Sequence, residues 1–460
     1  TDEQRALMQQ SDKGEVTVAV QVSDESGAQP IECEFIWPGC PPARAKPVPR
    51  RPLPPHPKGK DPIMKQVQDA YIVAATRTPI GRSGRGYFRN TRPDELLVAA
   101  IKSAMLQVPT LDPKAIEDAI IGCSFPEGEQ GMNMARIATG LAFSHPVGGV
   151  TVNRFCASGV TAIQMAADRI RVGEADVMIA GGAESMSMVP MGGGKPSFNP
   201  EVFAKDENVG IAYGMGLTAE KVAQQWKVTR EMQDAFALES HMRAIKAQQA
   251  GEFTDEITPI EVLERVPNLA TGEVITKTRT VNLDEGPRPD TSLEGLAKLR
   301  PVFAARGSVT AGNSSQTSDG AGALILASEK AVKQFGLTPL ARFVSYAARG
   351  VPPEIMGIGP IEAIPAALRY AGLKSEDIGW YELNEAFAAQ SLAVVNTLGL
   401  DPAKVNPMGG AIALGHPLGA TGAIRAATVV HALRRHKLKY GMVTMCVGTG
   451  QGAAGIFEAV

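Results

Sequence analysis

The sequence has few cysteines, few aromatic residues and no long apolar run. Its five cysteines, at positions 33, 40, 123, 156 and 446 of 460 residues, form neither a disulfide framework nor the close pairs of a zinc site. No run reaches the roughly 18 apolar residues that a membrane span needs, and the N-terminus lacks the order of a signal peptide. We therefore expect a globular protein of a reducing, intracellular compartment, without a membrane span or a bound metal.

An excess of charge of either sign is also lacking. The chain has 46 basic and 48 acidic side chains, a net charge of -2 and an isoelectric point near 6.3, which gives no electrostatic reason to expect nucleic acid as a partner. With 44% hydrophobic residues it can bury a sizeable core. The length predicts two to four structural units.

Residues 1–63 differ from the rest of the chain. Residues 1–40 hold two basic and eight acidic side chains, residues 41–60 hold six basic and no acidic ones, and ten prolines lie between positions 38 and 62. The alternation over residues 16–22 predicts a strand, and the prolines predict an extended linker. This extension could dock an acidic partner, but we favour an appendage unrelated to the chemistry. Met64 would suit a natural start of the chain.

From Met64 onward the pattern is typical of an α/β fold. It predicts strands over residues 69–75 and 176–180, and helices from 93 to about 108 and from 158 to 172. This alternation predicts parallel βαβ units. The second half repeats the order with Val405-Asn406, a glycine-rich turn, a helix over 421–434 and a strand over 442–446, which indicates an internal duplication. Residues 187–305 would be an insertion that covers a ligand.

Cys156 lies in Asn153-Arg154-Phe155-Cys156-Ala157-Ser158-Gly159, where a strand meets a helix. The positive end of a helix lowers the pKa of a thiol, so a nucleophilic thiolate is expected here. The small neighbours leave room for a substrate and for backbone N–H groups that face an oxyanion. An inert buried cysteine is the equal alternative on this segment alone.

His416 lies among several glycines in Gly415-His416-Pro417-Leu418-Gly419, just before a helix. Backbone of this kind can approach a ligand closely, and the imidazole would suit a base that takes the proton of a cysteine. The other histidines occupy linker, loop or polar helical positions, where solvated side chains are expected.

Two further segments end strands. Cys446 precedes Val447-Gly448-Thr449-Gly450, at the strand end where a parallel sheet presents its site, although a packed core thiol is as good an interpretation. The glycines do not have the spacing of a dinucleotide loop. Asn384 follows Trp380-Tyr381-Glu382-Leu383, where it could cap a helix or hold a water at an oxyanion hole, and Glu385 would be an acid of the first helical turn.

These four segments, in this order, resemble the thiolase family from about Gln66 to Val460, and Gly312-Asn313-Ser314-Ser315 and Gly181-Gly182-Ala183-Glu184-Ser185-Met186 add to the likeness. The resemblance implies a five-layer αβαβα fold from two duplicated halves with an inserted loop subdomain. The halves would be residues 64–186 with 306–335, and residues 336–460. The insertion would be residues 187–305, and residues 1–63 depart from the family.

The resemblance also implies roles. Cys156 matches the acylated nucleophile, His416 its base, and Cys446 the acid/base that serves the acetyl α-carbon and the incoming CoA thiol. Asn384 matches the holder of a water that, with His416, stabilises the enolate oxygen, while the backbone N–H groups of Cys156 and Gly448 match a second oxyanion hole. The positions that resemble CoA contacts are Ser315, Phe303 and Arg288, the last at the nucleotide end.

The implied reaction is the cleavage of 3-ketoacyl-CoA by CoA in fatty-acid β-oxidation, with CoA as co-substrate and no permanently bound cofactor. Gln316 stands where biosynthetic members tend to carry a small residue, which favours the degradative type over a biosynthetic acetoacetyl-CoA thiolase. The resemblance implies a homodimer or homotetramer, and such enzymes often work beside a hydratase/dehydrogenase subunit. The C-terminal Glu458-Ala459-Val460 is not a peroxisomal tripeptide, so we expect a cytoplasmic setting.

Two other classes remain as alternatives. Decarboxylating condensing enzymes share the duplicated fold but replace the second cysteine with histidine or asparagine, so Cys446 counts against them. A non-catalytic lipid carrier with this fold would be favoured by the loss of Cys156, His416 or Cys446, and all three are present.

Overall fold

The computed structural model describes residues 17–19, 32–34 and 67–460, and the chain divides into two compact units, Thr1–Ile63 and Met64–Val460. In the first unit, strand β1 (Thr17–Ala19) pairs antiparallel with β2 (Glu32–Glu34). Strand β1 lies inside the stretch where the sequence predicts a strand. The rest of that stretch and the proline-rich linker lie outside the described residues.

The second unit alternates strands and helices. Its strands are β3 (Ala70–Arg77), β4 (Gly81–Arg82), β5 (Asp118–Gly122), β6 (Val150–Val152), β7 (Val177–Ser185), β8 (Ile260–Pro267), β9 (Val274–Val281), β10 (Ser318–Ser328), β11 (Ala341–Gly350), β12 (Ile378–Leu383), β13 (Tyr440–Val447) and β14 (Gln451–Ala459). Its α-helices are α2 (Pro93–Gln107), α3 (Met134–Phe143), α4 (Ser158–Arg171), α5 (Met215–Gln225), α6 (Arg230–Gln249), α7 (Leu293–Ala297), α8 (Glu329–Phe335), α9 (Gly359–Ala371), α10 (Ala388–Leu398), α11 (Ala411–Leu414) and α12 (Leu418–Arg435). Short 3-10 helices are η1 (Pro113–Ala115), η2 (Gly128–Gln130), η3 (Phe155–Ala157), η4 (Pro200–Ala204), η5 (Asp206–Ala212), η6 (Pro353–Ile358) and η7 (Ser375–Asp377).

The main sheet has two parts. Its strand order is β12-β13-β14-β11-β3-β10-β7-β5-β6 with β4 on β10, and β11 meets β3 at two residue pairs, Ala341↔Ile72 and Arg342↔Tyr71. Parallel pairing occurs where β5 meets β6 and β7 and where β12 meets β13, whereas β10 and β14 pair antiparallel with their neighbours. The prediction of parallel units is therefore wrong for β3, β10, β11 and β14, which all pair antiparallel with their neighbours. Strand β14 follows β13 after the turn 448–450, which is too short for the crossover that parallel strands need.

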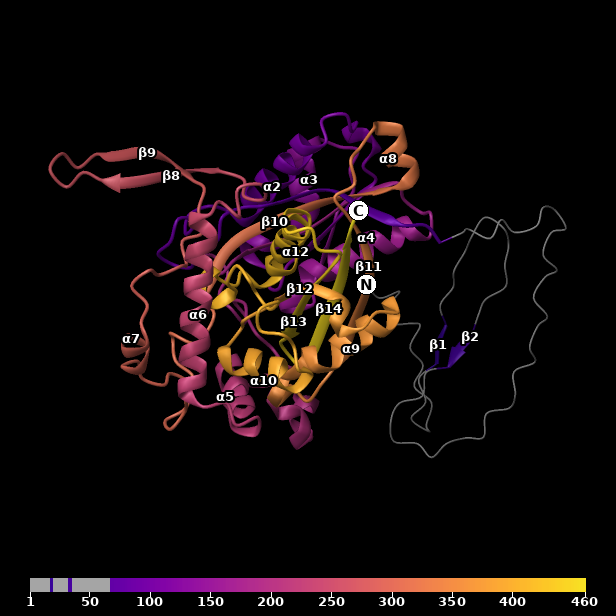
Figure 1. The fold of residues 1–460 in the computed structure, drawn as a ribbon. Coiled ribbons are helices and arrows are strands. Elements are labelled where there is room, and N and C mark those ends of the chain that lie inside the picture. The colour runs from indigo at the N-terminus through magenta and orange to yellow at the C-terminus, as the bar shows by residue number, and fades with distance from the viewer. Residues whose placement is uncertain (1–16, 20–31, 35–66) are drawn as a thin grey trace, which may run out of the picture. The chain divides into compact units, whose positions relative to one another are not determined.

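The two sheet parts enclose a buried helical layer. Helix α4 packs on β5 and β7, while α12 packs on β7 and β10 of the first part and on β13 and β14 of the second. Helix α2 covers β3 and β10 from outside, and α9 covers β11 and β14. This confirms the five-layer αβαβα order, and Figure 1 shows α12 in the middle of this unit. Nearly all residues of α12 are buried, because it has a sheet on both sides.

The duplication is visible in the pairing. Strands β5 and β6 pair in parallel in the first part, and Tyr381 of β12 forms the corresponding parallel bridge with Val405 in the second. Strand β7 runs on to Ser185, beyond the predicted end at residue 180. A Cβ on Gly182 would lie 2.3 Å from the carbonyl oxygen of Gly419, so this glycine admits the start of α12 instead of ending the strand.

Residues between β7 and β10 pack on both halves. Helix α6 lies against α10 and α11 of the second half, while Ile260, Val262 and Val281, at the base of the β8–β9 hairpin, belong to the hydrophobic core of the first. The outer end of the hairpin projects from the body of this unit (Figure 1).

Candidate active site

Cys156 lies in η3, on the turn between β6 and α4. Phe155 before it has a φ of 44°, in the left-handed region that an aromatic residue rarely adopts. Asn153 Oδ1 accepts a hydrogen bond from the Phe155 N–H at 2.7 Å, and Ser158 Oγ accepts from the Arg154 N–H at 2.8 Å and donates to the Phe155 carbonyl at 2.6 Å. Side chains on both sides thus hold a strained turn that carries the thiol.

The Cys156 thiol is less acidic than the sequence suggests. Burial raises the pKa of Cys156 to about 12, although hydrogen bonds from the backbone N–H groups of Gly448 and of Cys156 itself act in the opposite direction. The expectation of a lowered pKa is wrong because desolvation of the thiolate outweighs the helix end. Cys156 is therefore a thiol at neutral pH and needs a base when it attacks a substrate.

Cys446 and Gly448 lie at the end of β13. The Cys446 side chain is fully buried and packs with Ala219, Met356 and Phe387. Burial raises the pKa of Cys446, and the neighbouring Cys156 raises it further. Two thiols that influence one another in this way cannot both ionise readily, so one proton-donating thiol is available beside the other.

His416 lies between α11 and α12, and each of its ring nitrogens contacts a neighbouring side chain. Its Nδ1 is 2.7 Å from Thr421 Oγ1 and its Nε2 is 3.3 Å from Asn384 Nδ2. With the Asn384 amide donating to Nε2, the ring proton lies on Nδ1 and is donated to Thr421. Burial, followed by the charge of Arg425, lowers the pKa of His416 to about 3. The imidazole is thus neutral and carries its lone pair on Nε2, as a general base requires.

Asn384 does not cap a helix. Helix α10 begins at Ala388 with Phe387 as its N-cap, so the capping interpretation is wrong. The Asn384 N–H donates to the Thr444 carbonyl at 2.9 Å, two positions before Cys446, and this bond joins the Asn384–His416 pair to β13. Among the described residues, Asn384 Oδ1 is buried without a hydrogen-bond partner. A buried polar atom of this kind is normally satisfied by a bound water or a ligand atom.

Glu385 is also buried, instead of being an acid of the first helical turn. Its carboxylate accepts hydrogen bonds from Ser240 Oγ at 2.6 Å, Asn406 Nδ2 at 2.8 Å and the Ile412 N–H at 3.1 Å. Burial raises the pKa of Glu385, and these donors oppose that shift. The side chain therefore ties α6 to the loop that leads to His416.

Two supporting residues were missed by the sequence analysis. Thr421 contacts the ring of His416, and Glu184, at the end of β7, accepts hydrogen bonds from the Gly419 and Ser124 N–H groups at 2.8 Å each. The repeated pattern Ala157-Ser158-Gly159 and Ala420-Thr421-Gly422 was a signal for Thr421, because Ser158 holds the Cys156 turn in the same way.

The three predicted CoA contacts lie in two places. The Ser315 N–H donates to the Ala386 carbonyl at 2.9 Å, and the Phe303 ring packs edge-on against Phe387 with centroids 6.0 Å apart. Both therefore lie beside the Asn384 segment. Arg288 instead lines a cavity of about 180 Å³, together with His241, Asp290, Thr291, Ser292, Gly295, Leu296, Leu299, Ala311, Gly312, Gln316 and Ile412.

The surroundings of Arg288 are positively charged. Burial lowers the pKa of Arg288, and the nearby Arg82 and Arg85 lower it further. Burial and the charges of Arg288 and Arg82 lower the pKa of His241 to about 4. The carboxylate of Asp290 in the same cavity offsets part of this charge. A cluster of guanidinium groups is suited to phosphate groups.

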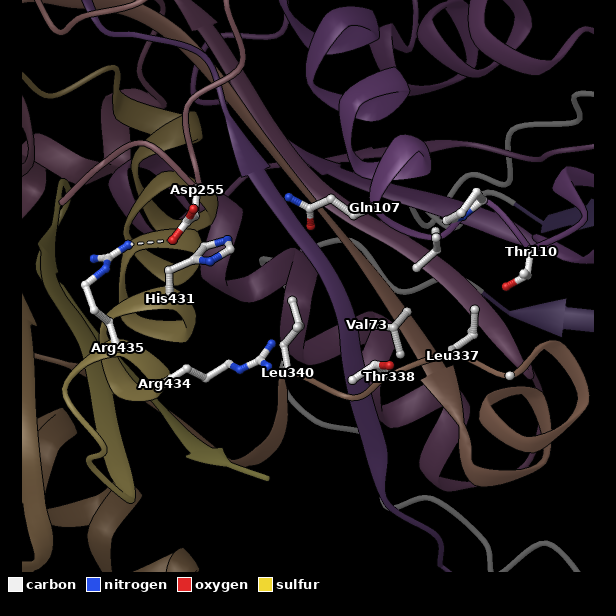
Figure 2. A pocket seen from close by; sticks show the side chains of 13 residues that line it. Val73, Gln107, Thr110, Asp255, Leu337, Thr338, Leu340, His431, Arg434 and Arg435 are labelled. Atoms are coloured by element: carbon white, nitrogen blue, oxygen red, sulfur yellow. Dashed lines mark hydrogen bonds and ion pairs between the residues drawn. The ribbon is translucent and has the colours of Figure 1, made fainter. Parts of the chain in front are cut away.

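A larger cleft lies away from these residues, at the C-terminal end of α12. It has a volume of about 870 Å³ and is lined by residues that include Val73, Gln107, His431 and Arg434. In Figure 2, Arg435 reaches Asp255 at one side of this cleft, through an ion pair of 3.2 Å. None of the predicted site residues lines it.

The described residues contain no cluster of histidine, cysteine, aspartate or glutamate that could hold a metal ion. The same part of the chain has no helix that is both long and apolar enough to cross a membrane.

Comparisons with known proteins agree on one family. Residues 70–330 match the family model described as "Thiolase, N-terminal domain", and residues 337–459 match "Thiolase, C-terminal domain". The chain is 48% identical over 394 residues to the 3-ketoacyl-CoA thiolase of Bacillus subtilis, which covers 85% of this chain and 100% of that protein.

Solved structures give the same result. A crystal structure of human mitochondrial 3-ketoacyl-CoA thiolase in complex with CoA has a TM-score of 0.75 and 39% identity, covering 85% of this chain and 98% of that one. The Bacillus anthracis acetyl-CoA acetyltransferase has a TM-score of 0.77 and 39% identity, covering 86% of this chain and 100% of that one. The family that the sequence motifs resemble is thereby confirmed.

Proposed function

The chain belongs to the thiolase family, and from this premise we propose that it cleaves 3-ketoacyl-CoA with CoA in fatty-acid β-oxidation. The products are acetyl-CoA and an acyl-CoA shortened by two carbons. The observation that carries this proposal is the pair of interacting thiols, Cys156 and Cys446, joined through β13 to the neutral imidazole of His416. The full-length match to a 3-ketoacyl-CoA thiolase supports the same reaction.

In the first step the Cys156 sulfur attacks the C3 ketone of the substrate. His416 Nε2 accepts the thiol proton, which a thiol with a raised pKa does not lose by itself. The oxyanion that forms on C3 is stabilised by the backbone N–H groups of Cys156 and Gly448, which already point at the sulfur.

In the second step the bond between C2 and C3 breaks, and its electron pair passes to the enolate of acetyl-CoA. Cys446 donates its proton to C2, while His416 and a water held by Asn384 stabilise the enolate oxygen. The Cys446 thiolate then takes the proton of an incoming CoA thiol, whose sulfur attacks the acyl group on Cys156. The proton held by His416 returns to the Cys156 sulfur as the shortened acyl-CoA leaves.

CoA is proposed to lie between the insertion and the catalytic loops. Arg288, with Arg82 and Arg85 close by, would bind phosphate groups at the nucleotide end. Ser315 and Phe303 would contact the part of CoA nearer the reacting thiols, since both lie beside the Asn384 segment.

The domain division, the assembly and the setting are proposed on the basis of the family. We assign residues 64–186 with 306–335 to the first half, 336–460 to the second, and 187–305 to the subdomain over CoA, with residues 1–63 as an extension. A homodimer or homotetramer in the cytoplasm is proposed, working beside a hydratase/dehydrogenase subunit.

The test compares CoA-dependent cleavage of 3-ketohexadecanoyl-CoA and of acetoacetyl-CoA, with Cys156→Ala as the control. Cleavage of the long substrate, lost in the variant, is the expected result. The likeness to an acetyl-CoA acetyltransferase makes a biosynthetic acetoacetyl-CoA thiolase the second candidate, and activity confined to acetoacetyl-CoA would favour it. Absence of activity on both substrates would refute both.

A further inference from the structure

Arg425 is a buried cation on the same helix as the residue that orients His416. It follows Thr421 by one helical turn in α12, so the two side chains lie on one face of the helix. Thr421 contacts His416 Nδ1 at 2.7 Å, and Arg425 is 3% exposed. A positive charge is thus held without solvent near the imidazole.

The charge of Arg425 is incompletely neutralised. Its Nη1 lies 3.5 Å from Glu382 Oε2, which is long for a charged hydrogen bond, and its Nη2 is buried without a hydrogen-bond partner among the described residues. Glu382 is also engaged elsewhere, because its Oε1 accepts a hydrogen bond from Trp380 Nε1 at 2.8 Å. Much of the positive field of Arg425 is therefore left to act on its surroundings.

The other buried carboxylates nearby have their own partners. Glu256 accepts hydrogen bonds from Arg77 Nε at 2.6 Å and Thr428 Oγ1 at 2.8 Å. Glu385 is bound by Ser240, Asn406 and Ile412. Neither forms an ion pair with Arg425 within the described residues, which leaves Glu382 as its counter-charge.

We propose that Arg425 is a positioning residue that keeps His416 an unprotonated base, and that the buried Glu382 sets how strongly it does so. This inference rests on the proposed function and assigns a role to two residues outside the catalytic set. Arg425 repels a proton on His416, and the Glu382 carboxylate weakens that repulsion. The ion pair therefore adjusts the basicity of His416 through its charge, without contacting the substrate.

The direction of the effect with pH follows from the groups around the pair. Burial raises the pKa of Glu382 to about 7, Arg425 and Trp380 oppose this, and the charges of Glu256 and Glu385 add to it. Below about pH 7 the Glu382 carboxyl gains a proton and no longer offsets Arg425. The repulsion at His416 then grows as protons become more available, so the base stays free in mild acid.

The test uses Arg425→Gln, Glu382→Gln and the double variant, and it measures the rate at which Cys156 is acylated by 3-ketoacyl-CoA. Each sample is held for seconds at a pH between about 2.5 and 8, a range that includes the acid limb expected from the His416 pKa of about 3, and is then quenched, and the adduct is quantified by mass spectrometry. In Arg425→Gln the acid limb of the rate is expected to move to higher pH by about one unit, because His416 gains a proton more easily. In Glu382→Gln the acid limb is expected to stay at its wild-type pH, because the Glu382 carboxyl is already protonated there, while the rate above pH 7 falls toward its value in mild acid.

The different pH ranges of the two effects separate this role from a structural one. Loss of the pair as a mere structural contact would lower the rate by the same factor at every pH in both variants. Arg425→Lys should restore the wild-type profile in part. The double variant leaves no unpaired buried charge, so it folds even where a single variant does not, and it should behave like Arg425→Gln. Equal acid limbs in the wild type and in folded Arg425→Gln would overturn the proposal.

A second measurement makes this result independent of the proposed function. Alkylation of Cys156 by iodoacetamide needs the same base but no thiolase substrate, and its pH profile should change in the same way in each variant. If no 3-ketoacyl-CoA acylates the wild type, the proposed function fails while the alkylation profiles still test Arg425. If the wild type is acylated normally but the alkylation profiles of the variants are unshifted, the role of Arg425 is refuted and the proposed function stands.

Discussion

The two halves of the main unit share a topology and differ in one connection. In the second half β13 meets β14 through residues 448–450, whereas in the first half β7 and β10 are separated by residues 186–317. The short turn brings the Gly448 N–H to Cys156, and the long insertion supplies side chains around the site, such as Met215, Phe303 and Arg288. A duplicated fold thus forms one asymmetric site. The second half has a tight backbone turn between its two strands, whereas the first half has a long insertion at the corresponding position.

The starts of α4 and α12, by contrast, show a feature that both halves share, a glycine at the point where the two helices meet. A Cβ on Gly159 would lie 2.5 Å from the Ala423 nitrogen, and one on Gly422 would lie 2.2 Å from the Val160 nitrogen. The two helices therefore meet backbone to backbone. The hydroxyl group just before each glycine supports a different group, since Ser158 holds the Cys156 turn and Thr421 holds His416.

The largest effect should come from the first half's thiol. Cys156→Ala is expected to lower thiolysis by about a thousandfold or more and to give no acyl adduct, as measured by kinetics and intact-protein mass spectrometry. Cys123→Ala is the matched control, because this buried thiol contacts Glu184 instead of the second thiol. A comparable loss in the control would contradict the assignment.

The second half's thiol should fail at a different step. In Cys446→Ala we expect turnover to fall by about a hundredfold to ten-thousandfold, while the acyl adduct on Cys156 still forms from an acyl-CoA donor. A quenched-reaction mass measurement beside the turnover assay distinguishes the steps. If Cys446→Ala blocked the adduct itself, the division of roles between the thiols would be wrong.

The close helix crossing can be tested through the stability of the fold. Gly422→Ala is expected to destabilise the fold by about 3 kcal/mol, because the methyl group must displace backbone atoms of α4. A Cβ on Gly448 would meet only Met215 and Phe155 at 3.8 Å, so Gly448→Ala should change stability by less than about 0.5 kcal/mol. Chemical denaturation at a fixed protein concentration compares the two, and equal losses would argue against the close crossing.

The buried base should also make stability depend on pH. The pKa of His416 is about 3 in the fold, against an ordinary value of 6.5, so its contribution is present above pH 6.5 and is lost as the pH falls toward 3. At pH 5 that loss is about 2 kcal/mol. His416→Gln should lose correspondingly less stability between pH 7 and pH 5 than the wild type. His145→Gln, at an exposed position, should follow the wild type.

The smallest expected effect concerns the support of that base. Thr421→Val keeps the shape but leaves the His416 Nδ1 proton without its acceptor, and kcat should fall by about tenfold with KM nearly unchanged. Thr428→Val removes a hydroxyl group on the same helix that faces Glu256, and it should leave kcat within about twofold. A loss of the same size in both variants would point to α12 as a whole instead of to the Thr421 contact.

Sequence patterns predicted the local elements better than their pairing. The helix expected over residues 158–172 is α4, and the strand expected over 442–446 lies within β13, because periodicity and turn residues are local signals. The antiparallel pairing of β10 and β14 was not predicted, because it depends on which strand lies beside which in the folded sheet.

The amino-acid sequence by itself determined the family, the duplication and the identity of Cys156, His416, Cys446 and Asn384 as candidates, because these follow from short motifs in a fixed order. Only the tertiary structure decided that the Cys156 thiol is protonated, that Thr421 orients His416, and that Arg425 lies buried behind it. Burial and electrostatic fields arise from residues that are distant along the chain and meet only after folding.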